Sequence, residues 1–329
     1  MSEYFDAARA QGMRIRYGID THGHNDYLSG LAELAARQPV TVLGSAQGDL
    51  GYPHRPVRDG ETIEMGEMTF EVIHTPATPL SMSACSSMPL GRRHPRPAAV
   101  GRGAAGGRPG PARPARLPTR RGPRRGNVLP HHPGENPDLP DHVEVFPTHV
   151  SGSLCGGNIG SRLSTTVGYE RRTNAVLSKV DSTEGFVSEC IRLDNLPAVP
   201  PYWRRMRGQN LAGVPLLGVL GEAPALPPAD FAAAQGDGAV VVDTRSVEAF
   251  GAAHIPGAVN VGLSSSFATW AGTVIPEGIP VLLVLDRRSD LWEVAWQLLR
   301  IGYPLPQGWL AGGMMACGPP PDHSGPYPR

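Results

Sequence analysis

Residues 239–245 read AVVVDTR and residues 254–260 read HIPGAVN. The first segment is a run of β-branched residues that ends in polar ones, which predicts a buried strand followed by a turn. The Pro-Gly pair of the second segment favours a tight turn that leads into another strand. An apolar run at 281–285 is typical of the next strand in a parallel sheet, and an amphipathic helix is expected over residues 291–301. The C-terminal part of the chain is therefore expected to be an α/β domain with a parallel sheet.

This order of segments resembles the rhodanese family, whose closing segment is matched by LAGGM at residues 310–314. A sulfur-carrying member of that family needs a cysteine just after the third of these strands, where backbone N–H groups stabilise a thiolate. This chain has Asp286 at the nucleophile position, in the sequence DRRSD. A carboxylate forms no persulfide and repels thiosulfate. We therefore expect residues 229–329 to be a non-catalytic rhodanese-like domain, preceded by a Pro-rich linker at 223–228.

A second informative stretch is THGHND at residues 21–26, which follows an apolar segment at 13–19 that is expected to be a strand. Two side chains one residue apart point the same way in an extended segment, so His22 and His24 suit one metal ion. Imidazole and carboxylate groups on strand-end loops bind Zn²⁺ or Fe²⁺ and leave a coordination position open. The segment FPTH, which ends at His149 after another expected strand, looks like the far end of the same site. The alternative is that the two neighbouring histidines only cap a strand.

These motifs, together with VRDGE at residues 57–61 and FEVIHTP at 70–76, resemble the metallo-β-lactamase superfamily. The resemblance implies an αββα sandwich, incomplete here, that is formed by residues 1–76 and 139–222. It also implies one divalent metal, Fe or Zn, held by the side chains of His22, His24, Asp26 and His149.

Position 27 separates two branches of this superfamily. The family has a histidine there as a ligand of a second metal ion, whereas this chain has Tyr27. The departure favours one metal, as in the persulfide (sulfur) dioxygenases, over the binuclear site of the hydroxyacylglutathione hydrolases. The substrate implied is a low-molecular-weight thiol or persulfide such as glutathione. Cys155, in a Gly-rich loop after His149, is a further candidate for substrate binding, with a purely structural thiol as the alternative.

From residue 77 to residue 134 the chain has no Asp, Glu or Lys, while Arg, Pro and Gly crowd together. Such a composition lacks both a period and a core, so residues 77–138 are expected to be disordered. The superfamily has Gly-His-Thr after Thr-Pro, and the loss of one base from GGC CAC ACC gives the Ala77-Thr78-Pro79 found here. We interpret the segment as frameshifted, with a third metal-binding histidine lost and the activity impaired. A natural disordered linker and an Arg-rich nucleic-acid arm are the alternatives, and the second lacks aromatic residues for stacking bases.

Properties of the whole chain bound its function. The 329 residues suggest two domains, and a net charge of zero argues against a nucleic-acid partner. The sequence has no run of about twenty apolar residues that could span a membrane, and its N-terminus lacks a basic-then-apolar signal, so a cytoplasmic location is expected. The superfamily begins with a strand hairpin before the helix expected at residues 4–11, so the chain is expected to be truncated at its start. Its four cysteines have no paired spacing and are expected to be reduced.

The sequence therefore favours a metal-dependent enzyme of thiol or sulfur metabolism, similar to persulfide dioxygenases or hydroxyacylglutathione hydrolases. A non-catalytic sulfur-relay or scaffold protein with an inactive rhodanese domain is the alternative from another class. The sequence alone leaves open the metal, the thiol carrier and the oligomeric state.

Overall fold

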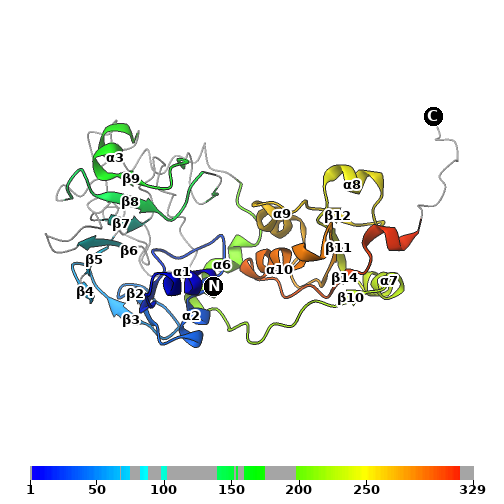
Figure 1. The fold of residues 1–329 in the computed structure, drawn as a ribbon, viewed down its shortest axis with the longest axis horizontal. Coiled ribbons are helices and arrows are strands. Elements are labelled where there is room, and N and C mark those ends of the chain that lie inside the picture. Colours follow the sequence, from blue (N-terminus) through cyan, green and yellow to red (C-terminus); the bar gives the residue numbers. More distant parts are fainter. Residues whose placement is uncertain are drawn as a thin grey trace, which may run out of the picture. The chain divides into compact units, whose positions relative to one another are not determined.

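The computed structural model describes residues 2–66, 68–74, 82–87, 98–101, 139–151, 153–154, 159–174 and 198–318. The chain divides into two compact units, and Figure 1 labels most of their elements. Unit 1 consists of Met1–Val199 and Arg207–Leu216, and unit 2 consists of Pro200–Met206 and Leu217–Arg329. The polypeptide therefore passes from one unit to the other three times.

Unit 1 begins with helix α1 (Ser2–Ala10), close to the helix expected at residues 4–11. A three-stranded parallel sheet follows, in the order β1-β2-β3. Its strands are β1 (Tyr17–Ile19), β2 (Thr41–Ser45) and β3 (Arg55–Val57), and helix α2 (Leu31–Arg37) connects the first two.

Strand β1 is shorter than the strand expected at residues 13–19. Its partner β2 starts only at Thr41, whose N–H donates to the carbonyl of Arg16 at 2.9 Å. Before that point helix α2 ends at its cap residue Gln38. The next residue, Pro39, has no N–H that could pair with a neighbouring strand. Pairing therefore begins at Tyr17 and places the following polar segment directly at the end of a short strand.

The second sheet of unit 1 has six strands in the order β4-β5-β6-β7-β8-β9. Neighbouring strands are antiparallel except for β7 and β8, which are parallel. The strands are β4 (Thr62–Met65), β5 (Met68–His74), β6 (Met82–Ser87), β7 (Ala98–Gly101), β8 (Glu144–Pro147) and β9 (Thr165–Thr166), and helix α3 (Val167–Thr173) follows directly.

The expectation of disorder throughout residues 77–138 is wrong for β6 and β7. Strand β6 pairs with β5 along its whole length, and β7 joins β6 to β8. Both strands fall in windows, MSACSS and AAVG, that contain no proline and no arginine, so every residue can supply a ladder N–H. An average over the whole segment conceals these short windows. The rest of the segment interpreted as frameshifted lies outside the described residues.

The two sheets of unit 1 share a hydrophobic core. Leu43 and Val57 of the parallel sheet pack with Ile63 and Val72 of the six-stranded sheet, and all four side chains are buried. Burial of side chains of this size stabilises a fold by about 1.5–3 kcal/mol each. The core thus packs the two sheets of unit 1 against each other.

Unit 2 contains a five-stranded, entirely parallel sheet in the order β10-β14-β13-β11-β12. Its strands are β10 (Ala225–Leu226), β11 (Val240–Asp243), β12 (Val259–Asn260), β13 (Val281–Val284) and β14 (Gly308–Leu310). Its helices are α7 (Pro228–Gly236), α8 (Val247–Ala252), α9 (Phe267–Val274) and α10 (Leu291–Arg300), with short 3₁₀ turns at Arg288–Asp290 and Gly313–Cys317.

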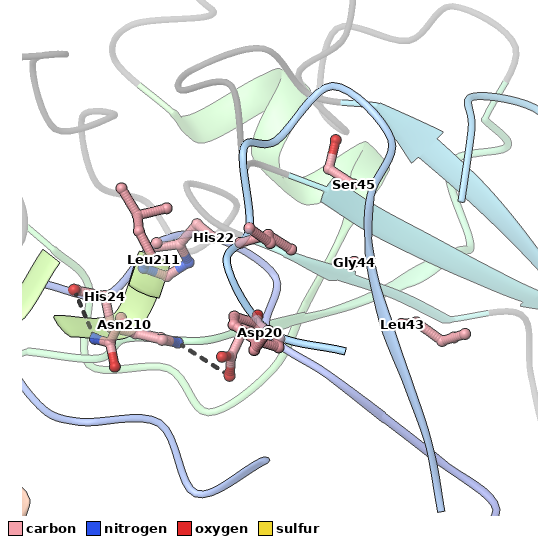
Figure 2. Close-up of a pocket in the computed structure, with 11 residues that line it drawn as sticks. Asp20, His22, His24, Leu43, Gly44, Ser45, Asn210 and Leu211 are labelled. Atoms are coloured by element: carbon pink, nitrogen blue, oxygen red, sulfur yellow. Dashed lines mark hydrogen bonds and ion pairs between the residues drawn. The ribbon is translucent and has the colours of Figure 1, made fainter. Parts of the chain in front are cut away.

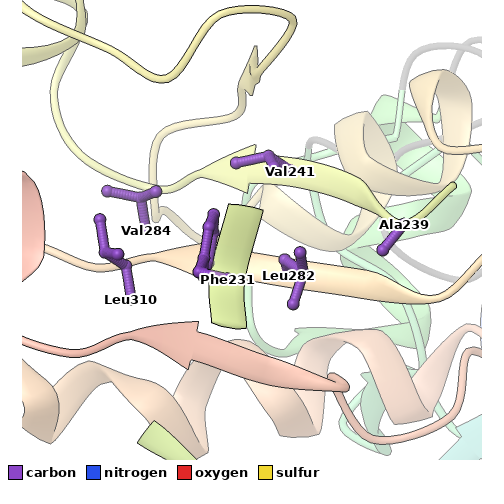
Figure 3. Packing of buried hydrophobic residues seen from close by; sticks show 6 residues of the cluster. All are labelled: Phe231, Ala239, Val241, Leu282, Val284 and Leu310. Atoms are coloured by element: carbon purple, nitrogen blue, oxygen red, sulfur yellow. The ribbon is translucent and has the colours of Figure 1, made fainter. Parts of the chain in front are cut away.

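The sheet of unit 2 is covered on both faces. Phe231 of α7 packs on one face against Val241, Leu282, Val284 and Leu310, as Figure 3 shows. The residues that alternate with these along the central strands, such as Val242 and Leu283, are also fully buried. Burial on both faces explains why the sequence shows continuous apolar runs here instead of alternation.

The segment 223–228, expected to be only a linker, contains the edge strand β10. Leu226 pairs with Leu310, and the N–H groups of Trp309 and Ala311 donate to the carbonyls of Pro224 and Leu226 at 3.0 and 2.9 Å. Prolines are tolerated here because β10 is an edge strand. It has a neighbouring strand on one side only, so some of its positions need no N–H for the ladder. The stretch therefore belongs to the fold of unit 2.

Helix α6 (Trp203–Ala212) is divided between the units, with Met206 the last residue in unit 2 and Arg207 the first in unit 1. Among the helices that the structure describes, none is both long and apolar enough to cross a membrane.

Candidate metal centre

Three histidines of unit 1 come from the ends of two strands in different sheets. His22 and His24 follow β1, and His149 follows β8. The residues just before the first and last of them, Thr21 and Thr148, form a hydrogen bond between their hydroxyls at 2.9 Å. This bond joins the two segments one residue before each histidine and so brings the imidazoles together.

The imidazole groups converge on one point. The Nε2 atoms of His22 and His149 are 3.1 Å apart, and one nitrogen from each of the three rings lies within 4.8 Å of the others. A bond of about 2.0–2.1 Å to a tetrahedral metal would place two such nitrogens roughly 3.3 Å apart. The spacing of the three groups is therefore compatible with a single metal ion after small side-chain adjustments.

His22 and His24 are almost completely buried, with 2% and 3% of their surface exposed. Within the described part of the chain, no hydrogen bond reaches Nδ1 of His24, although this atom is buried. A buried nitrogen that loses water without gaining a partner costs about 1–3 kcal/mol. A metal ion bound at Nδ1 would remove that cost, so the donor set fits a Zn²⁺ or Fe²⁺ ion.

Two carboxylates flank the histidines. Asp26 lies between two rings, with its oxygens 3.6 Å from Nδ1 of His24 and 3.7 Å from Nδ1 of His149. Burial acts to raise the pKa of Asp26, but the contact with His24 and the charge of His149 outweigh it and hold the pKa below its usual value. At neutral pH the carboxyl group of Asp26 is thus an anion beside the histidines, suited to bind a metal ion or to orient an imidazole ring.

Asp20, the residue before the motif, lies on the other side, 3.8 Å from Nε2 of His24. Here burial dominates and raises the pKa of the carboxyl, against the opposing effects of Ser29 and His24. Burial, followed by the nearby charge of Asp20, also raises the pKa of Tyr52 to about 12. Both groups line a cavity of about 20 Å³ beside the histidines, enough for a single water molecule.

Figure 2 shows this cavity with His22, His24 and Asp20 around it and with Asn210 of α6 beside His24. Asn210 was not among the residues singled out from the sequence. The residue is 7% exposed, and its side-chain N–H groups donate to the backbone carbonyls of His24 and Tyr27. No local pattern in α6, WRRMRGQNLA, indicates such a role, because the partners lie far away along the chain.

Tyr27, which stands where the superfamily has another histidine, contacts His24. The two rings stack with centroids 4.2 Å apart, and the phenol oxygen lies 3.1 Å from Nε2 of His24. The structure therefore brings together His22, His24 and His149, with Asp26 and Tyr27 at their side.

The remaining candidate residues lie elsewhere. Cys155 is outside the described residues. Asp286 is exposed and lies in the loop between β13 and α10, which also contains the ion pair of Arg287 with Asp290 at 3.4 Å. Cys317 is an exposed free cysteine at the end of the last 3₁₀ turn.

Comparisons with known proteins found similarity to parts of this chain and to nearly all of it. The family model described as "Rhodanese-like domain" matches residues 227–317. A hydroxyacylglutathione hydrolase of Hahella chejuensis is 33% identical over 64 residues, which are 20% of this chain and 25% of that protein. Another, from Alkalilimnicola ehrlichii, is 36% identical over 58 residues, 18% of this chain and 23% of its own length. The matched part thus spans about a quarter of these curated relatives.

A crystal structure described as a metallo-beta-lactamase from Staphylococcus aureus subsp. aureus COL resembles nearly the whole chain. The TM-score is 0.77 with 25% sequence identity, and the match covers 94% of this chain and 89% of that one. Because so much of the chain is covered, the likeness includes both units.

Proposed function

We propose that this chain, in which a metallo-β-lactamase fold precedes a rhodanese-like domain, is a single-metal enzyme that acts on a thiol derivative. The observation that carries the proposal is the convergence of His22, His24 and His149 in a buried cluster. Three neutral imidazoles are a common ligand set for a catalytic divalent metal, and they leave a coordination position for substrate or water. A bound metal would supply Lewis-acid activation of water or of dioxygen.

The protein side chains around the cluster would orient these ligands. Asp26, ionised and within 4 Å of two rings, can hold the second nitrogen of His149. Carboxylates in this position fix the orientation of a ligating imidazole and make it a stronger donor. Tyr27 is engaged with His24 through stacking and its hydroxyl, which supports one metal ion over two.

For the chemistry, we favour oxidation of a persulfide of a low-molecular-weight thiol such as glutathione. The balanced reaction is persulfide + O₂ + H₂O → thiol + sulfite + 2 H⁺, with the outer sulfur oxidised and O₂ reduced. The second candidate is hydrolysis of a thioester, which is supported by the two curated relatives named hydroxyacylglutathione hydrolases. Both reactions release a free thiol, and a metal in the same cluster would serve either.

A third candidate is a binding or scaffold protein without catalytic activity. It is supported by Asp286, which occupies the loop where a sulfur-carrying rhodanese has its cysteine. In every case we propose that unit 2 acts as a non-catalytic module.

The experiment that separates these candidates starts from metal-free protein loaded with Fe²⁺ or Zn²⁺ under anaerobic conditions. Oxygen uptake with glutathione persulfide and thiol release from a hydroxyacylglutathione are then measured, together with the bound metal. The variant His149→Ala should lose both metal and activity, whereas His142→Ala, at an exposed histidine of the same unit, should retain them. Fe-dependent oxygen uptake supports the first candidate and thioester hydrolysis the second. Absence of metal binding and of both activities would leave only the scaffold.

A further inference from the structure

We infer that Asn210 is a positioning residue for the candidate metal ligand His24, an inference that rests on the proposed function. The carboxamide Oδ1 accepts the backbone N–H of Ser29 at 2.8 Å. Its Nδ2 donates to the backbone carbonyl of His24 at 3.0 Å and to that of Tyr27 at 2.8 Å. One side chain thus binds the turn that carries the histidine at three points, across more than 180 positions of sequence.

Only a carboxamide of this length can make these contacts. An asparagine side chain has one carbonyl oxygen and two N–H donors, and here the oxygen meets a donor while the two N–H groups meet two acceptors. An aspartate would keep the size and the acceptor but would place oxygen against two carbonyl oxygens. Because Asn210 is buried, the carbonyls could not turn to water if the donors were removed.

The turn held in this way determines how His24 presents its two nitrogens. Asn210 fixes the backbone at His24 and again at Tyr27, so the Tyr27 ring is held against the imidazole at 4.2 Å. The phenol oxygen then lies beside Nε2 at 3.1 Å. If Nε2–H donates to that oxygen, Nδ1 carries the lone pair. Nδ1 is buried, no described group hydrogen-bonds to it, and it faces Oδ1 of Asp26 at 3.6 Å, so the pair suits a shared cation.

Asn210 lies near the end of helix α6, and contacts with the segment around Gly51 hold that end in place. The N–H of Gly51 donates to the carbonyl of Leu211 at 2.8 Å. A side-chain carbon added at Gly51 would lie 3.1 Å from the carbonyl oxygen of Ala212, so the segment around Gly51 and the helix approach each other closely. The end of the helix is therefore held firmly enough to orient another residue.

The test uses the full chain and Co²⁺ as the probe metal, because its visible absorption reports the ligand geometry. Six proteins are compared: the wild type, Asn210→Asp, Asn210→Ala, Tyr27→Phe, the ligand variant His149→Ala and the control Gln209→Ala on the same helix as Asn210. We expect Co²⁺ to bind about 10–100-fold more weakly to both Asn210 variants, the range typical for loss of an outer partner of a metal ligand. The visible spectrum of the bound Co²⁺ should also shift. The control should stay within about twofold of the wild type.

The outcomes separate this inference from the proposed function. If the wild type does not bind Co²⁺, the metal centre itself is wrong. If the wild type binds, His149→Ala does not, and Asn210→Asp binds with unchanged affinity and spectrum, only the role of Asn210 is overturned. Asn210→Ala could fail to fold, which circular dichroism of the metal-free protein would show. In that case the near-isosteric Asn210→Asp and the variant Tyr27→Phe decide whether Asn210 positions His24. Tyr27→Phe keeps the stacked ring, loses the oxygen and should shift the spectrum in the same direction.

Discussion

Nε2 of His22 lies 3.1 Å from Nε2 of His149, although 127 positions separate the two residues. Two imidazole nitrogens at this distance cannot both carry a proton that points at the other. One must offer its lone pair, or both must face a shared cation. The contact therefore makes metal binding the first property to measure.

Removal of either histidine should abolish tight metal binding. For His22→Ala and His149→Ala we expect Zn²⁺ affinity to fall by more than about 100-fold, since loss of a ligand should exceed the 10–100-fold effect of losing an outer partner. Competition with a chromophoric chelator measures the affinity. The exposed His142 is the matched control, and equal affinity in His142→Ala and His149→Ala would contradict the assignment.

The acid sensitivity of unit 1 should depend on Asp141. Hydrogen bonds from Arg171 and then Arg172 hold the pKa of this carboxyl below its usual value of 3.8. Since the folded-state pKa is depressed, the contribution to stability is present above the unfolded value and is lost as pH falls through the folded one. The variant Asp141→Asn should therefore be less stable than the wild type at neutral pH. This difference in stability should disappear as the pH is lowered below roughly 4.

Hydrogen exchange at the amide of Gly168 is a local readout for this effect, because that N–H donates to the carbonyl of Asp141 at 3.0 Å. The difference in protection between the wild type and Asp141→Asn should be largest near neutral pH. A difference that grows toward acid pH would show that the sign is wrong.

Unit 2 should be destabilised strongly when Arg245 is replaced. The carboxylate of Asp243 is fully buried and accepts hydrogen bonds from Nε of Arg245 at 2.9 Å and from its NH2 group at 2.6 Å. Removal of one partner leaves a buried charge unpaired, which typically costs about 3–5 kcal/mol. Arg245→Met should show this loss, while Arg300→Met, at an exposed arginine of α10, should change stability by less than about 0.5 kcal/mol.

Tryptophan fluorescence during urea unfolding measures this loss selectively, because all five tryptophans of the chain lie in the residues of unit 2. The double variant Asp243→Asn with Arg245→Met should recover part of the stability, since no charge is then buried alone. If Arg245→Met were as stable to urea as the control Arg300→Met, the ion pair would be ruled out as a stabilising contact.

The full chain should not transfer sulfur from thiosulfate to cyanide. Asp286 lies exposed in the loop between β13 and α10, and a carboxylate cannot form a persulfide. Thiocyanate formation should equal that of the variant Cys317→Ser, which lacks the exposed thiol. Turnover by the wild type that disappears in Cys317→Ser would show that this cysteine carries sulfur and that the module is not inactive.

The fold could be predicted from the sequence wherever the signal was local. The apolar run at 281–285 predicts β13, because a strand buried on both faces leaves a continuous apolar run, and the amphipathic pattern at 291–301 predicts α10, because such a helix leaves a periodic one. The metallo-β-lactamase fold and the rhodanese-like domain, both expected from motifs, are confirmed by the comparisons. Strands β6, β7 and β10 were missed because composition suggested disorder or a linker, while the partner strands that stabilise them lie elsewhere in the chain.

The surroundings of the candidate site were less predictable than its histidines. The spacing of His22 and His24 is a local motif, whereas Asn210 meets the same loop only through folding. Tyr27 was noted for the histidine it replaces, but its stacking on His24 depends on a turn that no pattern reveals. Contacts to the backbone leave no sequence pattern, because every residue type offers a backbone carbonyl and every type except proline offers an N–H.

The division of helix α6 between the units has a consequence for how such a protein can be cut or recombined. Tyr202 and Met206 are buried in unit 2, and Arg205 donates to the carbonyl of Ile301 at 2.8 Å. A fragment that starts at Leu217 would lose all three, whereas one that starts at Pro200 would take Asn210 away from the histidine loop. No single breakpoint in the chain therefore yields two fragments that each keep all of these contacts.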